Sequence, residues 1–327
     1  MRPPKFWTND SVLGRALDPI GRLYGAISSW RTSNGTYVQA PVPVISVGNL
    51  TVGGAGKTPV VRDLRPRLTD LGFCRPAVVL RGYGGRLKGP VKVDTLTHRA
   101  LDVGDEALLH ARDGMTWVSA KRIDGAYQAT EAGAKAIVLD DAHQHNSLAK
   151  DLSLVVIDGE TGFGNHRIVP AGPLRESIRS GLARADAIII MGNDRTDIAQ
   201  RLPADIPILH ATLAPSPDAA FLHQRKVVAF AGLGRPEKFF QSLSDVGAHL
   251  LATHTFDDHH LYQPADIQSI LDEAFALEAL PVTTEKDAMR LTPDQRQQVN
   301  VLRIGVAWKD TAALDALLKG TLTQSTA

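Results

Sequence analysis

Short apolar runs alternate with longer amphipathic segments along most of the chain. Five runs have the length and the aliphatic, β-branched content of buried strands, at residues 44–47, 77–80, 136–139, 154–157 and 187–191. Helical spacing of apolar residues lies between them, for example over 58–71 and 106–112. Because strands that alternate with helices form right-handed βαβ units, we predict an α/β fold with a mainly parallel sheet and helices on both faces.

The pattern restarts after a proline-rich stretch at residues 203–217. A new strand is predicted at 227–231, followed by a helical segment, and a later strand at 280–284. A chain of 327 residues also exceeds what one hydrophobic core usually organises. We therefore expect three parts, with the last boundary between residues 214 and 226: an N-terminal helical region (1–32), a large core (33–218) and a second, smaller α/β domain (219–327).

The N-terminal region carries an amphipathic helical pattern over residues 11–30. Its apolar positions form one stripe: Leu13, Ala16, Leu17, Ile20, Leu23, Tyr24, Ile27 and Trp30. Arg15, Arg22 and Arg31 lie off this stripe, and Phe6 and Trp7 precede it. A basic amphipathic helix with aromatic residues can lie on an anionic membrane surface. From the periodicity alone, however, packing of the stripe against the protein's own domain is the favoured interpretation.

Composition and charge restrict the possible function classes. The apolar fraction of 43% and the charged fraction of 22% are those of an ordinary globular protein. A formal net charge of +1 gives no reason to expect nucleic acid as a partner. The single cysteine, Cys74, cannot form an internal disulfide, and no signal-peptide pattern is present, so we expect a cytoplasmic location. No apolar run approaches the ~18 residues that a membrane-spanning helix needs.

The sharpest local signal is a glycine-rich loop between the first predicted strand and the helix after it. The loop reads Thr51-Val52-Gly53-Gly54-Ala55-Gly56-Lys57-Thr58. Its glycines let backbone N–H groups turn towards phosphate oxygens, and the helix N-terminus adds positive potential. In a P-loop of this kind, Lys57 reaches the terminal phosphates and the Thr58 hydroxyl ligates Mg²⁺. The loop therefore predicts binding of ATP with Mg²⁺, although Thr51 stands where the pattern has its first glycine.

Two carboxylates, Asp140 and Asp141, directly follow the predicted strand at 136–139. Ligands collect at the carboxyl edge of a parallel sheet, and carboxylate oxygens suit Mg²⁺. His143 and His145 come next, so these four residues could instead form a transition-metal site. No CxxC or HExxH pattern accompanies them, which favours Mg²⁺ at the acid pair.

Further motifs follow one another along the chain, and their order identifies a family. After Ser46-Val-Gly-Asn-Leu50 and the glycine-rich loop come Arg81-Gly-Tyr83, Gly104-Asp-Glu106, Leu139-Asp-Asp-x-x-Gln-His145, Pro173-Leu-Arg-Glu176, Gly232-x-Gly-x-Pro-x-x-Phe-Phe240, Asp258-His-His260 and Thr284-Glu-Lys-Asp287. In these motifs the chain resembles the lipid A 4′-kinases, also called tetraacyldisaccharide 4′-kinases, which are P-loop kinases. The resemblance extends over nearly the whole chain.

The resemblance implies transfer of the γ-phosphate of ATP to the 4′-hydroxyl of a tetraacylated glucosamine disaccharide 1-phosphate. It implies a P-loop NTPase-like core and a smaller α/β domain, with catalysis in the cleft between them. A glycolipid substrate also favours the membrane-surface interpretation of the N-terminal helix. The implied location is peripheral, on the cytoplasmic face of the bacterial inner membrane, and no obligate protein partner is inferred.

The resemblance also assigns roles to individual residues. By motif position, Asp105 takes the proton of the sugar hydroxyl, and His259 orients and tunes it when the domains close. Lys57 completes the predicted catalytic set. Five further residues are candidates for contacts with ATP or substrate, with a structural role equally open for each: Tyr83, Arg122, His145, Arg175 and Glu176.

The chain departs from the family pattern at a few positions, and other functions remain open. Ala142 and His143 replace the usual glycine and phenylalanine, and Leu80 and Ala107 are also unusual. None of these changes removes a charged group of the predicted site. The alternatives are a P-loop NTPase switch, for which no guanine-reading Asn-Lys-x-Asp is found, and a kinase for a soluble small molecule. A purely binding module is least favoured, because an acid pair beside a P-loop has little purpose there.

Overall fold

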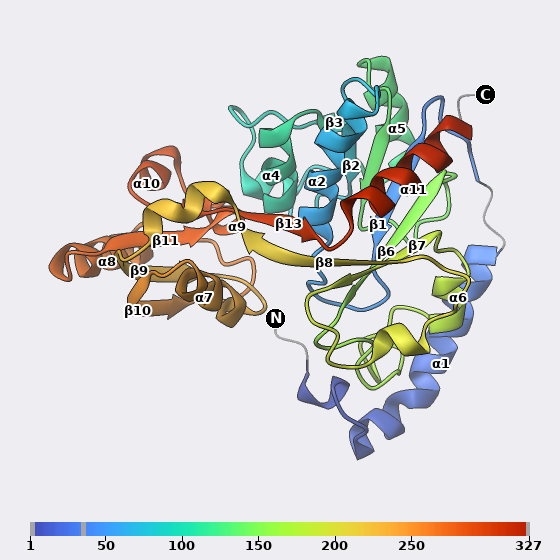
Figure 1. Cartoon of the computed structure of the whole chain (residues 1–327), viewed down its shortest axis with the longest axis horizontal. Coiled ribbons are helices and arrows are strands. Elements are labelled where there is room, and N and C mark those ends of the chain that lie inside the picture. Colours follow the sequence, from blue (N-terminus) through green and yellow to red (C-terminus); the bar gives the residue numbers. More distant parts are fainter. Residues whose placement is uncertain (1–3, 34–36, 325–327) are drawn as a thin grey trace.

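The computed structural model describes residues 4–33 and 37–324, which form two α/β units. The first unit contains a nine-stranded sheet and the second a four-stranded sheet. Figure 1 shows the second unit, coloured yellow to orange, extending from one side of the first, with the N-terminal helix α1 (Val12–Ser33) at the lower right. The predicted α/β fold with a second, smaller α/β unit is confirmed.

The large sheet is parallel except at its two edges. Across the sheet the strands are β13 (Ile304–Trp308), β8 (Ile208–Pro215), β7 (Ala187–Met191), β6 (Leu152–Asp158), β1 (Val44–Gly48), β5 (Ile137–Asp140), β2 (Ala77–Leu80), β4 (Thr116–Val118) and β3 (Val91–Lys92). The edge strands β13 and β3 run antiparallel to their neighbours. Strand β1 lies between β5 and β6, so the loop that follows it opens at the carboxyl edge of the sheet, where α/β proteins bind ligands.

Helices cover both faces of the large sheet. Helices α2 (Lys57–Asp70), α4 (Asp105–Asp113) and α11 (Thr311–Gln324) pack on one face, and the short α3 (Ala100–Val103) precedes α4. Helices α5 (Arg122–Glu131) and α6 (Ile178–Leu182) pack on the other. Successive strand residues point to opposite faces, so Val138 joins one core and Leu139 the other. Burial on both faces explains why the central strands appear in the sequence as continuous apolar runs.

The second unit has a small, wholly parallel sheet. Its strands are, in order, β10 (His249–Thr255), β9 (Lys226–Ala231), β11 (Leu280–Thr284) and β12 (Asn300–Leu302). Helix α7 (Pro236–Asp245) and helix α8 (Pro264–Ala276) belong to separate hydrophobic clusters. The short helices α9 (Glu285–Ala288) and α10 (Pro293–Gln297) follow β11. Like the first unit, it has a core on each side of its sheet.

The chain returns to the large sheet at its end. Strand β13 pairs with β8, with Ile304 opposite Pro215, and Leu314 and Leu318 of α11 belong to the same hydrophobic core as residues of α2. We expected one continuous second domain over residues 219–327. In the structure, the described chain after residue 303 belongs to the first unit instead. An apolar run predicts a strand, but it does not reveal which of two sheets the strand joins.

Helix α1 packs through glycines rather than through its apolar stripe. Gly14, Gly21 and Gly25 are buried, and a Cβ added to Gly21 would lie 2.5 Å from the carbonyl oxygen of Ile168. Six apolar residues of the helix are 47% to 84% exposed: Val12, Leu13, Ile20, Leu23, Tyr24 and Ile27. Packing of the stripe on the protein's own domain, which periodicity alone favoured, is therefore wrong. The side chains of Trp30 and Arg31 lie outside the described part of the chain.

Candidate active site

The glycine-rich loop joins the central strand β1 to helix α2. Gly53 and Gly56 have φ angles of +120° and +90°, which residues with a Cβ rarely adopt. A Cβ added to Gly53 or Gly54 would meet no atom within 4 Å, so this part of the loop borders open space. Lys57 is the first residue of α2 and Thr58 the second, so both lie where the helix N-terminus adds positive potential. Glycines with positive φ before a helix N-terminus are typical of a phosphate-binding loop.

Neighbouring segments hold the loop in place. The backbone N–H of Val52 donates to the carbonyl of Pro173 over 2.8 Å, and Asn49 Nδ2 donates to the carbonyl of Gly53 over 3.3 Å. Thr51 forms an isolated antiparallel bridge with Leu174. A bridged residue of this kind does not need the conformational freedom of glycine, which explains how threonine is accommodated at this position. Ala55, next to the open part of the loop, is buried.

The two aspartates at the end of β5 have different partners. Asp140 is buried, with Oδ2 2.8 Å from Nε2 of His110 and with no hydrogen-bond partner at Oδ1. Asp141 Oδ1 lies 3.5 Å from Nζ of Lys57 and 3.1 Å from Nη1 of Arg175. Burial by itself would raise the pKa of Asp141, but Lys57 and Arg175 outweigh it and hold the pKa below its ordinary value. The acid pair and Lys57 therefore meet at the carboxyl edge of the sheet.

The oxygen donors at this edge fit Mg²⁺ rather than a transition metal. Asp140 provides a buried carboxylate oxygen without a partner, and carboxylates are ligands that Mg²⁺ prefers. His143 lies elsewhere: its Nε2 contacts the carbonyl of Gly181 at 2.8 Å, and burial lowers its pKa to about 4, so the ring stays neutral. Within residues 4–33 and 37–324, no three His, Cys, Asp or Glu side chains are arranged to hold a metal ion. The alternative of a transition-metal site at Asp140, Asp141, His143 and His145 is therefore not supported.

Three other predicted residues surround the acid pair and the loop. Arg122 is buried; burial, followed by the charge of Arg81, lowers its pKa to about 10, and its Nε has no partner. Burial, followed by the charge of Arg122, lowers the pKa of His145 to about 4. Glu176 accepts two hydrogen bonds from Nη2 of Arg184, at 2.7 and 2.8 Å. Glu176 is thus engaged in a structural ion pair, whereas Arg122 retains donor capacity.

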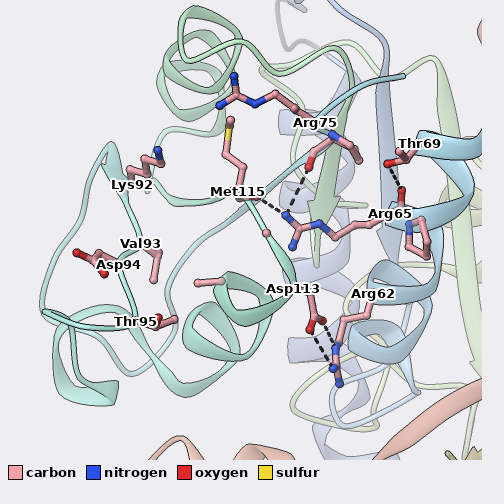
Figure 2. Close-up of a pocket in the computed structure, with 14 residues that line it drawn as sticks. Arg62, Arg65, Thr69, Arg75, Lys92, Val93, Asp94, Thr95, Asp113 and Met115 are labelled. Carbon is pink, nitrogen blue, oxygen red and sulfur yellow. Dashed lines mark hydrogen bonds and ion pairs between the residues drawn. The ribbon is translucent and has the colours of Figure 1, made fainter. Parts of the chain in front are cut away.

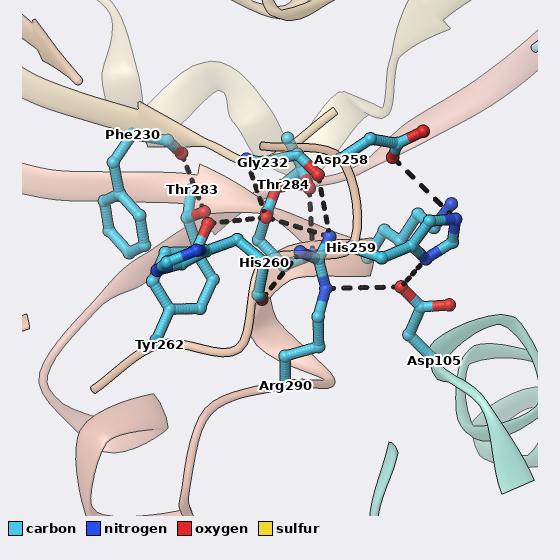
Figure 3. A network of polar contacts seen from close by, with 12 residues as sticks. Asp105, Phe230, Gly232, Asp258, His259, His260, Tyr262, Thr283, Thr284 and Arg290 are labelled. Carbon is cyan, nitrogen blue, oxygen red and sulfur yellow. Dashed lines mark hydrogen bonds and ion pairs between the residues drawn. The ribbon is translucent and has the colours of Figure 1, made fainter. Parts of the chain in front are cut away.

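Asp105 meets the second unit in a network of polar contacts (Figure 3). It lies in the first turn of α4 and is buried, with Oδ2 3.0 Å from Nδ1 of His259 and 3.2 Å from Nε of Arg290. The ring of Tyr83 lies beside His259, with 5.6 Å between the ring centroids. Burial would raise the pKa of Asp105, but the hydrogen bond from His259 and the charge of Lys286 outweigh it and keep the pKa below its ordinary value. The two residues that motif position paired are therefore in contact across the units.

Helix α4 connects this network to the acid pair. Asp105 begins the helix, and His110, which contacts Asp140, lies five residues later. At 1.5 Å per residue, about 7.5 Å of helix axis separates them. One rigid element therefore positions both the carboxylate that faces the second unit and the partner of the buried aspartate.

Three residues of this site had no role in the sequence-based predictions: His110, Asp287 and Arg290. Asp287 is fully buried and accepts hydrogen bonds from the Tyr262 hydroxyl at 2.6 Å and from the backbone N–H of Gly232 at 2.9 Å. It also lies 3.0 Å from Nη2 of Arg290 and so holds that guanidinium beside Asp105. The motif Thr284-Glu-Lys-Asp287 was a signal for Asp287. His110 had none, because its contact depends on tertiary packing.

A cleft of about 1040 Å³ lies away from this site (Figure 2). Its lining comes from α2, from the segments that precede β2 and β4, and from β3 with the residues that follow it; it includes Arg62, Arg65, Arg75 and Asp113. Arg65 donates to backbone carbonyls, among them that of Met115 over 2.7 Å, and Arg62 pairs with Asp113 at 2.5 Å. Because α/β sheets bind nucleotides at the carboxyl ends of their strands, this cleft is not the nucleotide site.

Known proteins resemble the chain over almost all of its length. The sequence model of one family, described as LpxK, tetraacyldisaccharide-1-P 4′-kinase, matches residues 13–323. The chain belongs to this family. The tetraacyldisaccharide 4′-kinase of Rhodospirillum rubrum is 52% identical, over 97% of both chains. That of Paramagnetospirillum magneticum is 51% identical, over 97% of this chain and 98% of its own.

A solved member of the tetraacyldisaccharide 4′-kinase family has the same fold. The crystal structure of LpxK from Aquifex aeolicus in complex with ATP superposes with a TM-score of 0.76 at 26% sequence identity. The match covers 95% of this chain and 100% of that chain, so it includes both units. The fold that the resemblance predicted is therefore confirmed, and the solved relative that shares it was crystallised with ATP.

Proposed function

We propose that this chain transfers the γ-phosphate of ATP to the 4′-hydroxyl of a tetraacylated glucosamine disaccharide 1-phosphate. The observation that carries the proposal is the contact of 3.0 Å between Asp105 of the first unit and His259 of the second. Asp105 lies on α4, and His110 of the same helix contacts Asp140. A carboxylate that can accept a hydroxyl proton is thereby held at the same sheet edge as a phosphate-binding loop. Membership of the family supports the identity of the acceptor.

The first unit binds the donor nucleotide in this proposal. Backbone amides of the loop and the ammonium of Lys57 contact the phosphate oxygens. Thr58, Asp140 and Asp141 would hold Mg²⁺, which when bound neutralises part of the phosphate charge. Arg175 shares Asp141 with Lys57, so two cations already lie where the phosphates bring negative charge.

Asp105 serves as the proton acceptor. The sugar hydroxyl oxygen forms a bond to the γ-phosphorus while the bond from that phosphorus to the bridging oxygen of ADP breaks, and the hydroxyl proton passes to the Asp105 carboxylate. A lowered pKa keeps this carboxylate ionised and able to accept. His259 belongs to the second unit, so the acceptor is fully oriented only when the two units are together.

A kinase assay with Mg-ATP and the disaccharide lipid tests this function. The parent protein should phosphorylate the lipid, and Lys57→Ala should lose nearly all of that activity. Rapid ATP hydrolysis without lipid, together with no lipid product, would instead indicate an NTPase switch. Phosphorylation of a soluble sugar but not of the lipid would indicate a small-molecule kinase.

We also propose that α1 rests on the cytoplasmic surface of the inner membrane. Its glycine face is occupied by the protein, and its apolar stripe is exposed. Arg15 and Arg22 extend from the helix with exposed side chains, although each also pairs with an aspartate. Among the described helices, none has the length and apolar content to cross a bilayer. An exposed apolar stripe flanked by arginines is the pattern of a helix that lies in a membrane interface.

Vesicle binding separates this role from a purely structural one. The double variant Ile20→Glu/Leu23→Glu should lose most of its cosedimentation with anionic phospholipid vesicles while keeping its activity on detergent-dispersed lipid. Leu96→Glu is the matched control, because Leu96 is 94% exposed but lies outside α1. Parental vesicle binding by the double variant would contradict the proposal.

A further inference from the structure

We infer that Arg235, a residue of the second unit, is a positioning residue for the phosphate loop and sets the direction of its backbone amides. The inference rests on the proposed function and extends it. It assigns part of the nucleotide site to a residue that lies outside the P-loop core. Arg235 directly precedes helix α7, on the turn that follows strand β9.

The Arg235 guanidinium reaches the first unit at three places, one of which is a long ion pair of 3.9 Å between its Nη1 and Oε2 of Glu160. Its Nη2 donates to the carbonyl oxygen of Gly54 over 2.8 Å. The same nitrogen pairs with Oδ2 of Asp158, the last residue of β6, which is buried. Burial would raise the pKa of Asp158, but the charge and hydrogen bond of Arg235 outweigh it and hold the pKa below its ordinary value. Asp158 therefore remains an anionic anchor that fixes Arg235 over the loop.

Because of the geometry of the peptide unit, the contact with the Gly54 carbonyl also orients the next backbone N–H. In a trans peptide the carbonyl oxygen and the following N–H point to opposite sides. Arg235 holds the carbonyl of Gly54 and therefore turns the N–H of Ala55 the other way. Asn49 holds the carbonyl of Gly53 in the same manner and so directs the N–H of Gly54. Two successive loop amides are thus oriented by side chains, one from each unit.

Glycines make this orientation dependent on outside support. Gly53 and Gly54 have no atom within 4 Å of an added Cβ, so local packing does not fix their peptides. Glycine also loses more conformational freedom on ordering than any other residue. A charged donor on the Gly54 carbonyl therefore lowers the cost of ordering the loop when phosphate binds.

The turn that carries Arg235 also leads to the proposed proton acceptor. Gly232, three residues earlier, donates its N–H to Asp287 and accepts from Nη2 of Arg290, the arginine beside Asp105. The N–H of His259 also donates to the carbonyl of Gly232 over 3.3 Å. One turn of the second unit thus supports the contacts with Asp105 and with the loop, so docking of this unit would organise donor and acceptor together.

Lys238, which lies on α7 three residues after Arg235, provides a matched control. Its Nζ lies 3.4 Å from Asp158 Oδ2 and 2.8 Å from Glu160 Oε2, so it also forms ion pairs between the units. Within the described part of the chain, the Lys238 side chain forms no hydrogen bond or ion pair with the loop. If Arg235 only helped the units to dock, loss of either cation would have the same effect.

The experiment measures the Kd for Mg-ATP by equilibrium dialysis, without lipid, for the parent, Arg235→Gln, Arg235→Lys, Lys238→Gln and Asp158→Asn. We expect Arg235→Gln to weaken binding about tenfold, equivalent to ~1.4 kcal/mol. Asp158→Asn should shift in the same direction, and Arg235→Lys should recover part of the loss. Lys238→Gln should stay within about twofold of the parent, and KM for ATP in the lipid assay should follow the Kd values.

Two results would overturn the inference. One is a parental Kd for Arg235→Gln in a protein that unfolds at the parental temperature; the other is an equal loss in Lys238→Gln. If Arg235→Gln weakens binding but also lowers the melting temperature strongly, Arg235→Lys decides between the two causes. This variant keeps the charge, so the inference requires that it bind Mg-ATP more tightly than Arg235→Gln. Failure of the parent to bind Mg-ATP would instead contradict the proposed function itself.

Discussion

Asp105 is 4% exposed, yet three cationic or hydrogen-bonding side chains of the second unit oppose the effect of its burial: His259, Lys286 and Arg290. A buried carboxylate without such partners would be neutral near pH 7. Here the pKa is lowered, so the carboxylate is ionised at neutral pH. The residue that we propose as the proton acceptor is therefore kept ionised by groups of the other unit.

Substitution of Asp105 by Asn should remove the proton acceptor and keep the shape of the side chain. We expect kcat for lipid phosphorylation to fall by about 10²–10⁴-fold, the usual contribution of a positioned general base. The Kd for Mg-ATP should stay near the parental value, because Asp105 is not part of the loop. Retention of most of the activity by Asp105→Asn would remove the assignment of this residue as the acceptor.

The pH dependence of the reaction should report on His259. In His259→Gln, burial of Asp105 is no longer opposed by the histidine hydrogen bond, so the pKa of the carboxyl rises. With a raised pKa, Asp105 becomes protonated at a higher pH. The acidic limb of the kcat/KM profile should therefore shift to higher pH. A measured profile with an unchanged acidic limb and only a lower plateau would show that His259 does not tune Asp105.

At the scale of elements, α1 has the reverse of the usual arrangement for an amphipathic surface helix. Its glycines face the protein and its large apolar residues face outwards. Arg167 of the first unit adds ion pairs to Asp10 at 3.2 Å and to Asp18 at 2.9 Å, which help to hold this segment. Close approach through glycines therefore leaves the apolar stripe available for another surface.

Glycine-to-alanine substitutions in two helices should have opposite effects on stability. Gly21→Ala places a Cβ 2.5 Å from the Ile168 carbonyl oxygen, so we expect a loss of about 1–3 kcal/mol and easier proteolysis of α1. Gly320→Ala in α11 meets no atom within 4 Å and should stabilise the protein by about 0.5–1 kcal/mol. Thermal unfolding and limited proteolysis measure both; equal effects of the two substitutions would contradict the close packing of α1.

At the scale of the whole molecule, the second unit contributes side chains to the proposed active site. His259 reaches Asp105 and Arg235 reaches the loop. Farther along α2, Glu285 of α9 lies 2.8 Å from Nη1 of Arg62 and adds another contact between the units. A ligand that binds at the proposed site stabilises the folded state and not the unfolded chain.

Mg-ADP should therefore raise the unfolding temperature. At a concentration of 100 Kd the expected stabilisation is about 2.7 kcal/mol, a shift of several degrees. Lys57→Ala should abolish the shift, because it removes the ammonium that faces the phosphates. Chelation with EDTA should reduce it, since the proposed Mg²⁺ ligands would then repel the nucleotide. A shift of the same size in Lys57→Ala would contradict the placement of the phosphates.

The features that the sequence revealed are those that depend on local pattern. The strands, the glycine-rich loop and the acid pair were predictable because period, glycine content and position after a strand are properties of short segments. Asp105 and His259 were paired only through their motifs. His110, Arg290 and Arg235 were not assigned, because their partners lie 30, 185 and 181 positions away in the sequence. For α1, periodicity alone favoured the wrong arrangement, since it identifies an apolar stripe but not the surface that covers it; only the resemblance favoured a stripe that faces a membrane.

The pairing of β8 with β13 makes the second unit an insertion. The chain leaves the large sheet at Pro215 and re-enters it at Ile304, and these two residues are register partners on neighbouring antiparallel strands. A short hairpin turn could therefore replace residues 216–303 without changing the path of the large sheet. A recombinant protein shortened in this way would keep the phosphate loop and the acid pair but lose Arg235, His259 and Arg290 together, so we expect weaker binding of Mg-ATP and no phosphoryl transfer.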